Sequence, residues 1–480
     1  MPALDLPAYD TAGFLDEMVE ADGSVRPHYR ALTECIAELG HERLSLLQHA
    51  TARAQLSYGM TFNVYSDRQG TEKILHLDIV PRIISGEEWD TIERGLRQRI
   101  RAINLFIADV YGEQKILADE ILPRELVLSS ACYLEACRGL RPPKDVWCHI
   151  TGSDIIKGDD GRFYVLEDNL RCPSGVSYML ENREILKRSF PELFERLRVR
   201  PVNNYVHDMR DMLAGLSPSD DPTIAVLTPG AYNSAYFEHS YLAQQLGAEL
   251  VEGRDLVVED DEVFMRTTTG LQRVDVIYRR VDDDFIDPLA FRPDSLLGTP
   301  GLFEVFRKGN VALVNAPGTG FADDKAVYAY IPRIIEYYLG EKPLLDNVRT
   351  YICAEEADRD YVIAHISELV VKQTDASGGY GMLIGPKSTP EQQAAFVEKI
   401  RAKPRNYIAQ PMINLSRVPT LTADGIEGRH VDLRPYILYG DEIVVTPGAL
   451  TRVALEKGSI VVNSSQGGGS KDTWVVDGAS

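Results

Sequence analysis

The sequence predicts a mixed α/β fold, with α+β elements, that contains one open α/β domain. Short apolar strands alternate with helical segments through the middle of the chain, a pattern typical of such a domain. The predicted strands are Thr223–Leu227, Val274–Tyr278 and Val311–Val314, and Tyr241–Leu246 lies in a helix. Turn signals at Asp160–Gly161 and Gly440–Asp441 predict antiparallel hairpins outside this domain. The chain of 480 residues is long enough for several structural units.

Composition limits the classes of partner. The chain has 51 basic and 72 acidic residues and a net charge of −21, which disfavours nucleic acid and anionic membranes as general partners. Any anion site must therefore be locally basic. The six cysteines form no CxxC pair, the N-terminus has no signal segment, and no run of 18 apolar residues occurs. We expect a cytoplasmic protein with reduced thiols.

Residues 1–57 predict an N-terminal helical appendage, from an apolar pattern that includes Leu32, Ile36 and Leu44. Strands are expected at 60–65 and 74–79. Residues 89–111 then predict a long amphipathic helix whose apolar positions follow a helical period. Its arginines, Arg97, Arg99 and Arg101, are expected on a solvated face, in preference to a contact with substrate.

The segment 149–174 predicts a hairpin that carries charge. If Asp160–Gly161 is its two-residue turn, Asp154 faces Glu167 across the two strands, at about 5 Å between Cβ atoms. Since strand side chains alternate, Asn169 and Arg171 extend the same row. Mg²⁺ prefers oxygen ligands, and an adjacent arginine suits a phosphoryl group. The pattern favours a magnesium site with bound nucleotide, and a solvated acidic hairpin face is the alternative.

Residues 177–200 predict a helix, and the polar segment 217–222 marks a domain boundary. Ligands of open α/β sheets lie beyond the C-terminal ends of the strands. This position favours Arg279, Arg280 and the Tyr232–Asn233 pair as substrate contacts. Structural roles for the two arginines are equally compatible with the sequence.

The segment 322–340 predicts a second anion site. Asp323 is the expected helix cap and Lys325 lies in the first turn, where a helix N-terminus and a lysine favour a bound anion. Pro332 lies too deep for an uninterrupted helix. We expect a kink or two helices there.

The segment 369–385 predicts two strands joined by a glycine-rich flap. Lys372 ends the first strand, and Ser377, Gly378, Gly379 and Gly381 let backbone N–H groups approach an anion. No Gly-Lys-Ser/Thr follows the glycines, and a strand follows where a dinucleotide site needs a helix. A phosphate-binding flap is favoured, and an ordinary glycine hairpin is the alternative.

The C-terminal third adds three features. Residues 407–413 predict a strand whose backbone can pair with an adenine edge. A hairpin of 429–438 and 443–445 places His430, Asp432 and Arg434 on one face. Arg452 precedes the glycine-rich segment 463–471, for which a flexible tail is the alternative reading.

These motifs together resemble the ATP-grasp superfamily of ATP-dependent ligases. The resemblance implies that Lys325 and Lys372 are the two nucleotide lysines. It implies an adenine hinge at Gln410, Pro411, Met412 and Ile413, and a metal cluster of Asp154, Glu167 and Asn169 followed by Arg171. Ordinary members carry the metal cluster after the hinge, whereas here it lies before Lys325. Residues 60–475 resemble the circularly permuted type 2 ATP-grasp family, including the stretches DRQGTEKILHLDIVPRII and VVNSSQGGGSKDTWVV.

The resemblance implies a carboxylate–amine ligase that uses ATP and Mg²⁺ and forms an acyl phosphate, in small-peptide biosynthesis. Its substrates would be a small acid and an amine or peptide, and protein partners from the same pathway are a further expectation. Implied catalytic residues are Arg171, Arg452, His430, Asp432 and Arg434, and implied substrate contacts are Asn463, Ser464, Ser465, Gly467, Arg279 and Asn233. The implied units are 1–57, 58–216, a pre-ATP-grasp α/β domain at 217–320, and a nucleotide-binding portion at 321–480. A phosphotransferase and a non-catalytic ATP-bound scaffold are the alternatives.

Overall fold

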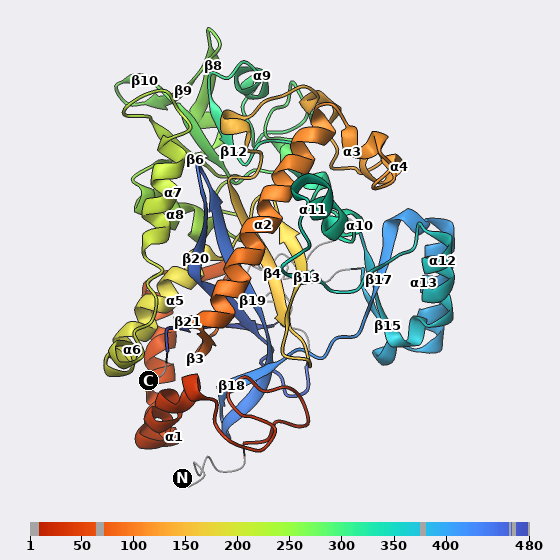
Figure 1. The fold of residues 1–480 in the computed structure, drawn as a ribbon. Helices are drawn as coiled ribbons and strands as arrows, with labels where there is room; N and C mark the ends of the chain where they lie inside the picture. The colour runs from red at the N-terminus through yellow and green to blue at the C-terminus, as the bar shows by residue number, and fades with distance from the viewer. Residues whose placement is uncertain (1–8, 64–71, 375–380, 460–461, 463–466, 479–480) are drawn as a thin grey trace.

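A large twisted sheet runs through the middle of the molecule (Figure 1). The computed structural model describes residues 9–63, 72–374, 381–459, 462 and 467–478. The strand order is β13-β5-β4-β19-β20-β21-β3, and β18 pairs with the first part of β19. These strands are β3 (Leu77–Ser85), β4 (Ile150–Lys157), β5 (Phe163–Asn169), β13 (Asp346–Asn347), β18 (Arg417–Thr422), β19 (Gly425–Tyr439), β20 (Ile443–Val453) and β21 (Gly469–Val476). The parallel pair β3 and β21 comes from opposite ends of the sequence.

The predicted charged hairpin is confirmed as β4 and β5. Asp154 pairs with Glu167 and Gly152 pairs with Asn169. The predicted two-residue turn is wrong, because Lys157 pairs with Phe163 and Gly158 donates its N–H to the Arg162 carbonyl. A register shift between Asp154 and Ile155 then restores the predicted partner. A β-bulge inserts one residue in one strand, which accounts for the difference of one.

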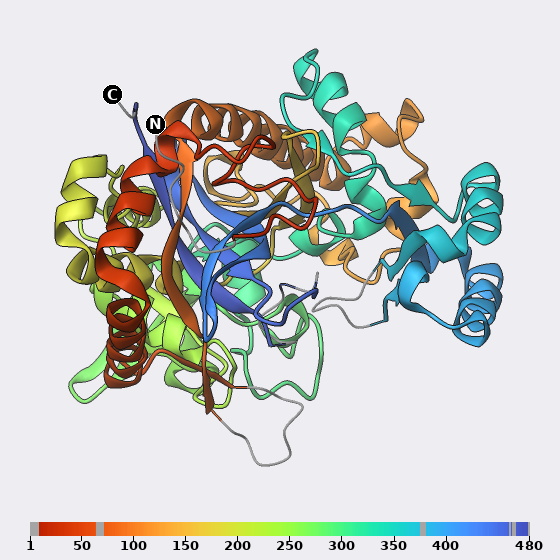
Figure 2. The same cartoon turned by 90° about the horizontal axis from the view of Figure 1, so that it is seen from below.

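A smaller antiparallel sheet forms a lobe that projects from this body (Figure 1). Its order is β14-β17-β15-β16, and the view from below shows the lobe standing beside the body (Figure 2). The elements are β14 (Tyr351–Ile352), α12 (Glu356–Ala364), β15 (Leu369–Gln373), β16 (Leu383–Ile384), α13 (Pro390–Ala402) and β17 (Tyr407–Pro411). The two strands predicted on either side of the glycine-rich flap are therefore confirmed.

The predicted open α/β sheet is also confirmed. Its order is β12-β11-β6-β7, and its three pairings are all parallel. The strands are β6 (Ile224–Leu227), β7 (Glu249–Val251), β11 (Val276–Arg279) and β12 (Ala312–Val314). Neighbouring elements are α7 (Asn204–Ala214), α8 (Tyr236–Leu246), α9 (Leu302–Arg307) and the antiparallel strands β8 (Leu256–Glu259), β9 (Glu262–Thr267) and β10 (Gly270–Arg273).

The remaining elements refine several sequence expectations. They are α1 (Arg30–Ser57), β1 (Thr61–Asn63), β2 (Glu72–Ile74), α2 (Gly86–Tyr111), α3 (Lys115–Ala118), α4 (Arg124–Leu128), α5 (Val176–Ser189), α6 (Pro191–Leu197), α10 (Lys325–Tyr328) and α11 (Ile331–Leu339). The helix expected at 177–200 is two helices, because Pro191 begins the second. Pro332 lies in the first turn of α11, which confirms the predicted break.

The expected role of Asp323 as a helix cap is wrong. The cap of α10 is Asp324, whose Oδ1 accepts a hydrogen bond of 2.8 Å from the Ala326 N–H. Asp323 instead accepts a hydrogen bond of 2.9 Å from Nε of Arg171. Both residues are acidic and adjacent, so the sequence does not show which one adopts the extended cap conformation.

The N-terminal region is only partly the predicted helix. α1 begins at Arg30 and contains Gly40 at φ +67°, whereas residues 9–26 contain no α-helix. This segment packs against the large sheet through an isolated bridge from Asp16 to Arg417, and a second bridge, from Val19 to Val25, closes a turn within the segment itself. Met18 and Glu17 are almost fully buried. Residues 9–26 therefore belong to the body of the molecule.

Helix α2 lies across the large sheet (Figure 1). Ser85 and Glu88 form a capping box at its start. Its buried apolar face is Trp89, Ile92, Leu96, Ile100, Ile103, Phe106, Ile107 and Val110. Burial of each such side chain contributes about 1.5–3 kcal/mol, so this face fixes the helix on the core.

The solvated position expected for Arg99 on α2 is wrong. Arg99 is 1% exposed and donates hydrogen bonds of 2.7–3.0 Å from Nε and Nη2 to the Asp168 carboxylate on β5. Its Nη1 donates to Asn347 of β13 at 2.7 Å. Asp168 lies between Glu167 and Asn169, so α2 holds the strand from which both side chains project. Arg97 keeps a half-exposed pair with Glu93.

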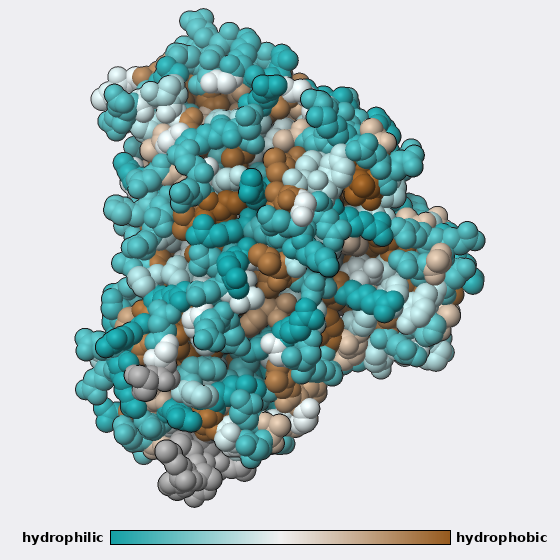
Figure 3. Space-filling model, viewed as in Figure 1, coloured by the Kyte–Doolittle hydropathy of each residue, from teal (hydrophilic) through white to brown (hydrophobic). Residues whose placement is uncertain are grey.

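The face of the molecule in Figure 3 is largely hydrophilic. This agrees with the excess of acidic residues in the sequence. Within the described part of the chain, every helix is too short or too polar to cross a membrane.

Arg99→Met is expected to lower the free energy of unfolding by about 3–5 kcal/mol, because it leaves Asp168 charged and buried without its partner. The matched control on the same helix is Arg97→Met. That control removes a surface pair and is expected to cost less than about 1 kcal/mol. Chemical denaturation measures both. Equal losses would show that the Arg99–Asp168 pair does not anchor β5.

Candidate functional site

The carboxylate of Asp154 lies at the centre of a buried charge cluster. Asp154 is 1% exposed. Arg434 donates to both of its oxygens, from Nε to Oδ1 at 2.6 Å and from Nη2 to Oδ2 at 2.8 Å. Arg452 donates from Nη2 to Oδ2 at 2.5 Å and also pairs with Asp432, from Nε at 2.9–3.0 Å. Strands β4, β19 and β20 thus bring two arginines and two aspartates together.

The charges in this cluster shift the pKa values of Asp154 and Glu167 in opposite directions. Burial alone would raise the pKa of Asp154, but Arg434 and Arg452 hold it well below its usual range. Burial and the nearby Asp154 charge together raise the pKa of Glu167. Two carboxyl groups that share a site cannot both ionise freely unless a cation lies between them.

The oxygen atoms beside Asp154 are of the kind that could hold Mg²⁺. Glu167 and Asn169 are half-buried and project toward Asp154, and Nδ2 of Asn169 lies 3.5 Å from Oδ1 of Asp154. Arg434 and Arg452 occupy most of the lone pairs of Asp154, so Glu167 is the more available carboxylate. Among the described residues, no group of three or more His, Cys, Asp or Glu side chains is placed to hold a metal, so a metal here would also need the Asn169 amide and ligands from outside the protein. Two carboxylates and an amide would leave the remaining positions to phosphate and water, as Mg²⁺ prefers.

The two predicted lysines approach this row from α10 and β15. Lys325 Nζ lies 3.7 Å from Oε2 of Glu167. Lys372 Nζ donates to Oε1 of Gln410 at 2.7 Å, and Gln410 Nε2 donates to Thr350 at 2.9 Å. Burial lowers the pKa of Lys372 to about 8, although Glu167 opposes the shift. The Lys325 N–H also donates to the Thr374 carbonyl at the end of β15, at 3.3 Å.

A pocket of about 270 Å³ lies beside the row. Its lining combines loop 129–132 with the charged row and the end of the small sheet. The lining residues are Ser129, Ser130, Ala131, Cys132, Glu167, Asp168, Asn169, Arg171, Gly320, Asp323, Asp324, Lys325, Thr374, Arg405 and Asn406. Arg171 is 38% exposed at its side chain and pairs through Nε with Asp323. Burial raises the pKa of Asp323 to about 6, despite Arg171.

Sequence reasoning missed Arg405 and loop 129–132. Arg405 Nη2 pairs with Asp324 at 2.8 Å and Nη1 donates to the Thr374 hydroxyl at 3.1 Å. It lies in the short connection before β17, and loop 129–132 follows α4. Neither stretch has a recognisable motif. Tertiary contact alone reveals them.

Several predicted site residues lie outside the cluster. Arg280 is buried and pairs with Glu238, and Tyr232 is exposed. His430 Nδ1 lies 2.7 Å from the Leu415 carbonyl, and its ring meets Phe14 edge to face. Arg279 is fully buried and donates to the carbonyls of Asn315, Val281 and Ala316, which favours the structural role. Asn233 accepts the Ala235 N–H within its own turn.

Six predicted residues lie outside the described part of the chain: Ser377, Gly378, Gly379, Asn463, Ser464 and Ser465. Their flanking glycines Gly381 and Gly467 have φ of +68° and +92°, a conformation that favours glycine. Pro411 ends β17, and Met412 and Ile413 follow it without regular structure.

Comparison with known proteins identifies the family of this arrangement. A family model described as "Circularly permuted ATP-grasp type 2" matches residues 81–454. The protein sll0335 of Synechocystis sp. is 58% identical over 480 residues, 99% of this chain and 100% of that protein. A Frankia alni protein named "Putative glutamate--cysteine ligase 2-3" is 43% identical over 475 residues, 98% of this chain and 54% of that protein.

A solved structure shows the same fold at low sequence identity. The glutathione synthetase-like effector GSS30 from Globodera pallida, in its apo form, aligns with a TM-score of 0.58 and 11% identity. The alignment covers 91% of this chain and 98% of that chain. At that identity the likeness concerns the fold alone.

Glu167→Gln is expected to raise the melting temperature of the metal-free protein, because it removes the repulsion between Glu167 and Asp154. Mg²⁺ is expected to raise the melting temperature of the unmodified protein and to have little effect on the variant. Thermal unfolding with EDTA or with Mg²⁺ measures both effects. The control is Glu368→Gln at an exposed position. This variant should change neither the melting temperature of the metal-free protein nor its stabilisation by Mg²⁺. A variant that Mg²⁺ still stabilises fully would contradict the role of Glu167.

Proposed function

Because the chain belongs to the circularly permuted ATP-grasp type 2 family, we propose that it is an ATP-dependent carboxylate–amine ligase. The observation that best supports this proposal is the approach of Lys325 to Glu167, at 3.7 Å, beside the buried Asp154 cluster. This contact brings the lysine proposed to bind phosphate to the row proposed to hold the metal, from distant parts of the chain. The Frankia alni name also refers to a ligase, but that protein is about twice as long, so its glutamate and cysteine are not carried over.

The proposed reaction has two steps. A carboxylate oxygen of the acid attacks the γ-phosphorus of ATP, which forms an acyl phosphate and releases ADP. The amine then attacks the acyl carbon, the carbon–oxygen bond to phosphate breaks, and the amine loses a proton. The products are an amide, ADP and inorganic phosphate. An amino acid or peptide is the proposed acceptor.

The residues divide the work by position. Lys325 and Lys372 would neutralise nucleotide phosphates, and residues 410–413 would receive the adenine edge. Glu167, Asn169 and the remaining lone pair of Asp154 would hold Mg²⁺, which offsets phosphate charge when it is bound. Arg171, at the edge of the pocket, would stabilise charge on the transferring group. Catalysis would then come mainly from positioning and charge.

Arg434 and Arg452 would form a fixed electrostatic frame rather than mobile ligands of the substrate. Each is held by Asp154, and Arg452 is held by Asp432 as well. Charged groups whose orientation is already fixed pay no reorganisation cost when charge develops in a transition state. Removal of Arg452 would strand two buried aspartates, so the test of the acceptor side uses Arg171.

Lys372→Met is expected to weaken MgATP binding about 10- to 100-fold, through loss of a charged hydrogen bond. The pKa of Lys372 is about 8, so roughly half of this group is neutral at pH 8. A phosphate contact favours the ammonium form and raises that pKa. Binding at pH 8 should therefore take up as much as about half a proton, and less at pH 6.5.

Isothermal titration calorimetry at each pH, in two buffers of different ionisation enthalpy, measures this proton uptake. Lys372→Met should abolish it. The exposed Lys403→Met serves as the control and should retain both affinity and uptake. Unchanged affinity in Lys372→Met would remove Lys372 from the nucleotide site.

Arg171→Met is expected to leave MgATP affinity within a few-fold and to lower acid-dependent ADP formation by about two orders of magnitude, the size typical of one lost charge donor. A screen of acids and amines for ADP release, each with and without the other, first identifies the substrates. The control is Arg162→Met, an exposed arginine on the same hairpin. Melting curves must accompany the kinetics. Loss of ATP binding equal to that in Lys372→Met would place Arg171 in the nucleotide subsite instead.

A further inference from the structure

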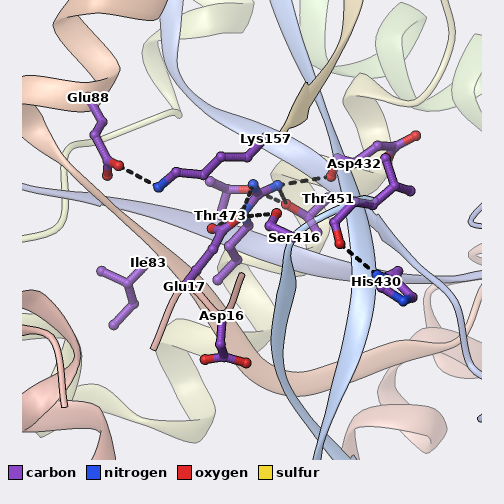
Figure 4. Close-up of polar contacts among 12 residues, drawn as sticks. Asp16, Glu17, Ile83, Glu88, Lys157, Ser416, His430, Asp432, Thr451 and Thr473 are labelled. Atoms are coloured by element: carbon purple, nitrogen blue, oxygen red, sulfur yellow. Dashed lines mark hydrogen bonds and ion pairs between the residues drawn. The ribbon is translucent and has the colours of Figure 1, made fainter. Parts of the chain in front are cut away.

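A buried ion pair joins the N-terminal segment to the large sheet (Figure 4). Glu17 is 3% exposed and accepts hydrogen bonds from Arg82 of β3, from Nε at 2.8 Å and from Nη2 at 2.7 Å. The Ser416 hydroxyl donates to the same carboxylate at 2.5 Å. The backbone of this segment pairs with Arg417, through Glu17 N–H to the Arg417 carbonyl at 2.9 Å. Residues 15–17 are therefore fixed by both backbone and side chain.

Arg82 extends from this pair to strand β19. It is fully buried, and its Nη1 donates to the Asp432 carbonyl at 3.0 Å. The same nitrogen lies 3.5 Å from the Thr451 hydroxyl, which contacts the Thr473 hydroxyl at 2.8 Å. One guanidinium thus contacts the N-terminal segment and strands β19 and β20.

The network reaches the charge cluster through two short links. Asp432 offers its carbonyl to Arg82, and its carboxylate holds Arg452. Thr451 and Arg452 are consecutive on β20, and successive strand side chains point to opposite faces. Thr451 faces Arg82, whereas Arg452 faces Asp154. The Glu17–Arg82 pair therefore supports the cluster from the opposite face of the sheet.

We propose that Glu17 and Arg82 are positioning residues that fix β19 at Asp432 and thereby hold Arg452 against Asp154. An apolar pair of similar size would avoid the cost of burying two charges. It would lose the donor that reaches the Asp432 carbonyl. Glu17 supplies the opposite charge that offsets the desolvation of the Arg82 guanidinium at this depth. Segment 9–26, which lies before the region matched by the family model, would therefore help to position the charge cluster of the candidate site.

The experiment compares Arg82→Lys with Arg183→Lys in the full chain. Lysine keeps the charge that faces Glu17, but a single ammonium does not reproduce the two-sided fork of arginine. Arg183 is the matched control, because it is equally buried and pairs with Asp472 and with the carbonyls of Thr473 and Arg200. The hydrogen bonds of Arg183 to described residues do not include Asp432 or Arg452.

Hydrogen–deuterium exchange is the primary measurement. Arg82→Lys should raise the amide exchange rate about tenfold at 430–434 and 450–453, because these segments would open locally more often. Arg183→Lys should leave 430–434 at the wild-type rate; its partner Asp472 pairs with Leu450, so only 430–434 separates the two variants. Wild-type exchange at 430–434 in Arg82→Lys, or an equal rise there in both variants, would overturn the proposal. If Arg82→Lys fails to fold, Ser416→Ala replaces it and should give a smaller rise in the same segments, whereas no rise would overturn the proposal.

A kinetic arm rests on the proposed ligase function. Arg82→Lys should lower kcat for acid-dependent ADP formation about tenfold and leave KM for ATP within about twofold, because it acts through a group that meets developing charge. The losses in kcat, expressed as activation free energies, should not add when Arg82→Lys is combined with Arg452→Lys. They should add when Arg82→Lys is combined with Arg171→Met. Additivity in both combinations would overturn the coupling. Absence of any ATP-dependent ligation in the unmodified protein would reject the ligase function, and the exchange result would still decide the positioning role.

Discussion

The ion pairs around Asp154 are the constraint on which the site depends. A buried carboxylate remains ionised only if its partners offset the free energy of its desolvation. Here Arg434 of β19 and Arg452 of β20 do so. Asp432 in turn balances Arg452. The three strands must therefore keep one register, since a slip of one residue would turn these side chains to the other face. Glu167 and Asn169 then have a fixed neighbour against which they are positioned.

The fixed charges divide the site into two electrostatic environments. Near Asp154 two guanidiniums keep the carboxylate anionic, whereas Glu167 and Lys372 have pKa values shifted toward their neutral forms. Polyphosphate and a divalent cation would reverse both shifts, since the cation favours the Glu167 carboxylate and the phosphates favour the Lys372 ammonium. Without ligands, the charged forms of Glu167 and Lys372 are therefore disfavoured, and binding of the proposed ligands would relieve this cost.

Local sequence signals predicted the elements whose chemistry is contained in one hairpin or one turn. The Asp154–Glu167 pair, the Lys372 strand and the break at Pro332 all follow from turn residues and alternation. The cap at Asp324, the buried Arg99 and the displaced His430 do not. Arg99 and His430 depend on partners distant in the sequence, for which periodicity has no signal. The cap of α10 is local, but two adjacent aspartates are equally suited to it. The predicted turn at Asp160–Gly161 is wrong by one residue, and the β-bulge next to Asp154 compensates for it, so that Asp154 still pairs with Glu167.

The order of the strands explains why buried ion pairs occur so often in this sheet. Strand β3 and strand β21 pair in parallel across almost the whole sequence, a contact with a large loop-closure cost. Lys471 and Asp78 form a fully buried pair between these two strands, and Arg82 of β3 joins Glu17 to β19. A shift of two residues along a strand keeps every side chain on its own face, so hydrophobic burial penalises it only weakly, whereas the same shift separates a buried charge from its partner. In a permuted chain, where distant segments must meet in one register, these pairs penalise the wrong alignments that apolar side chains alone would tolerate.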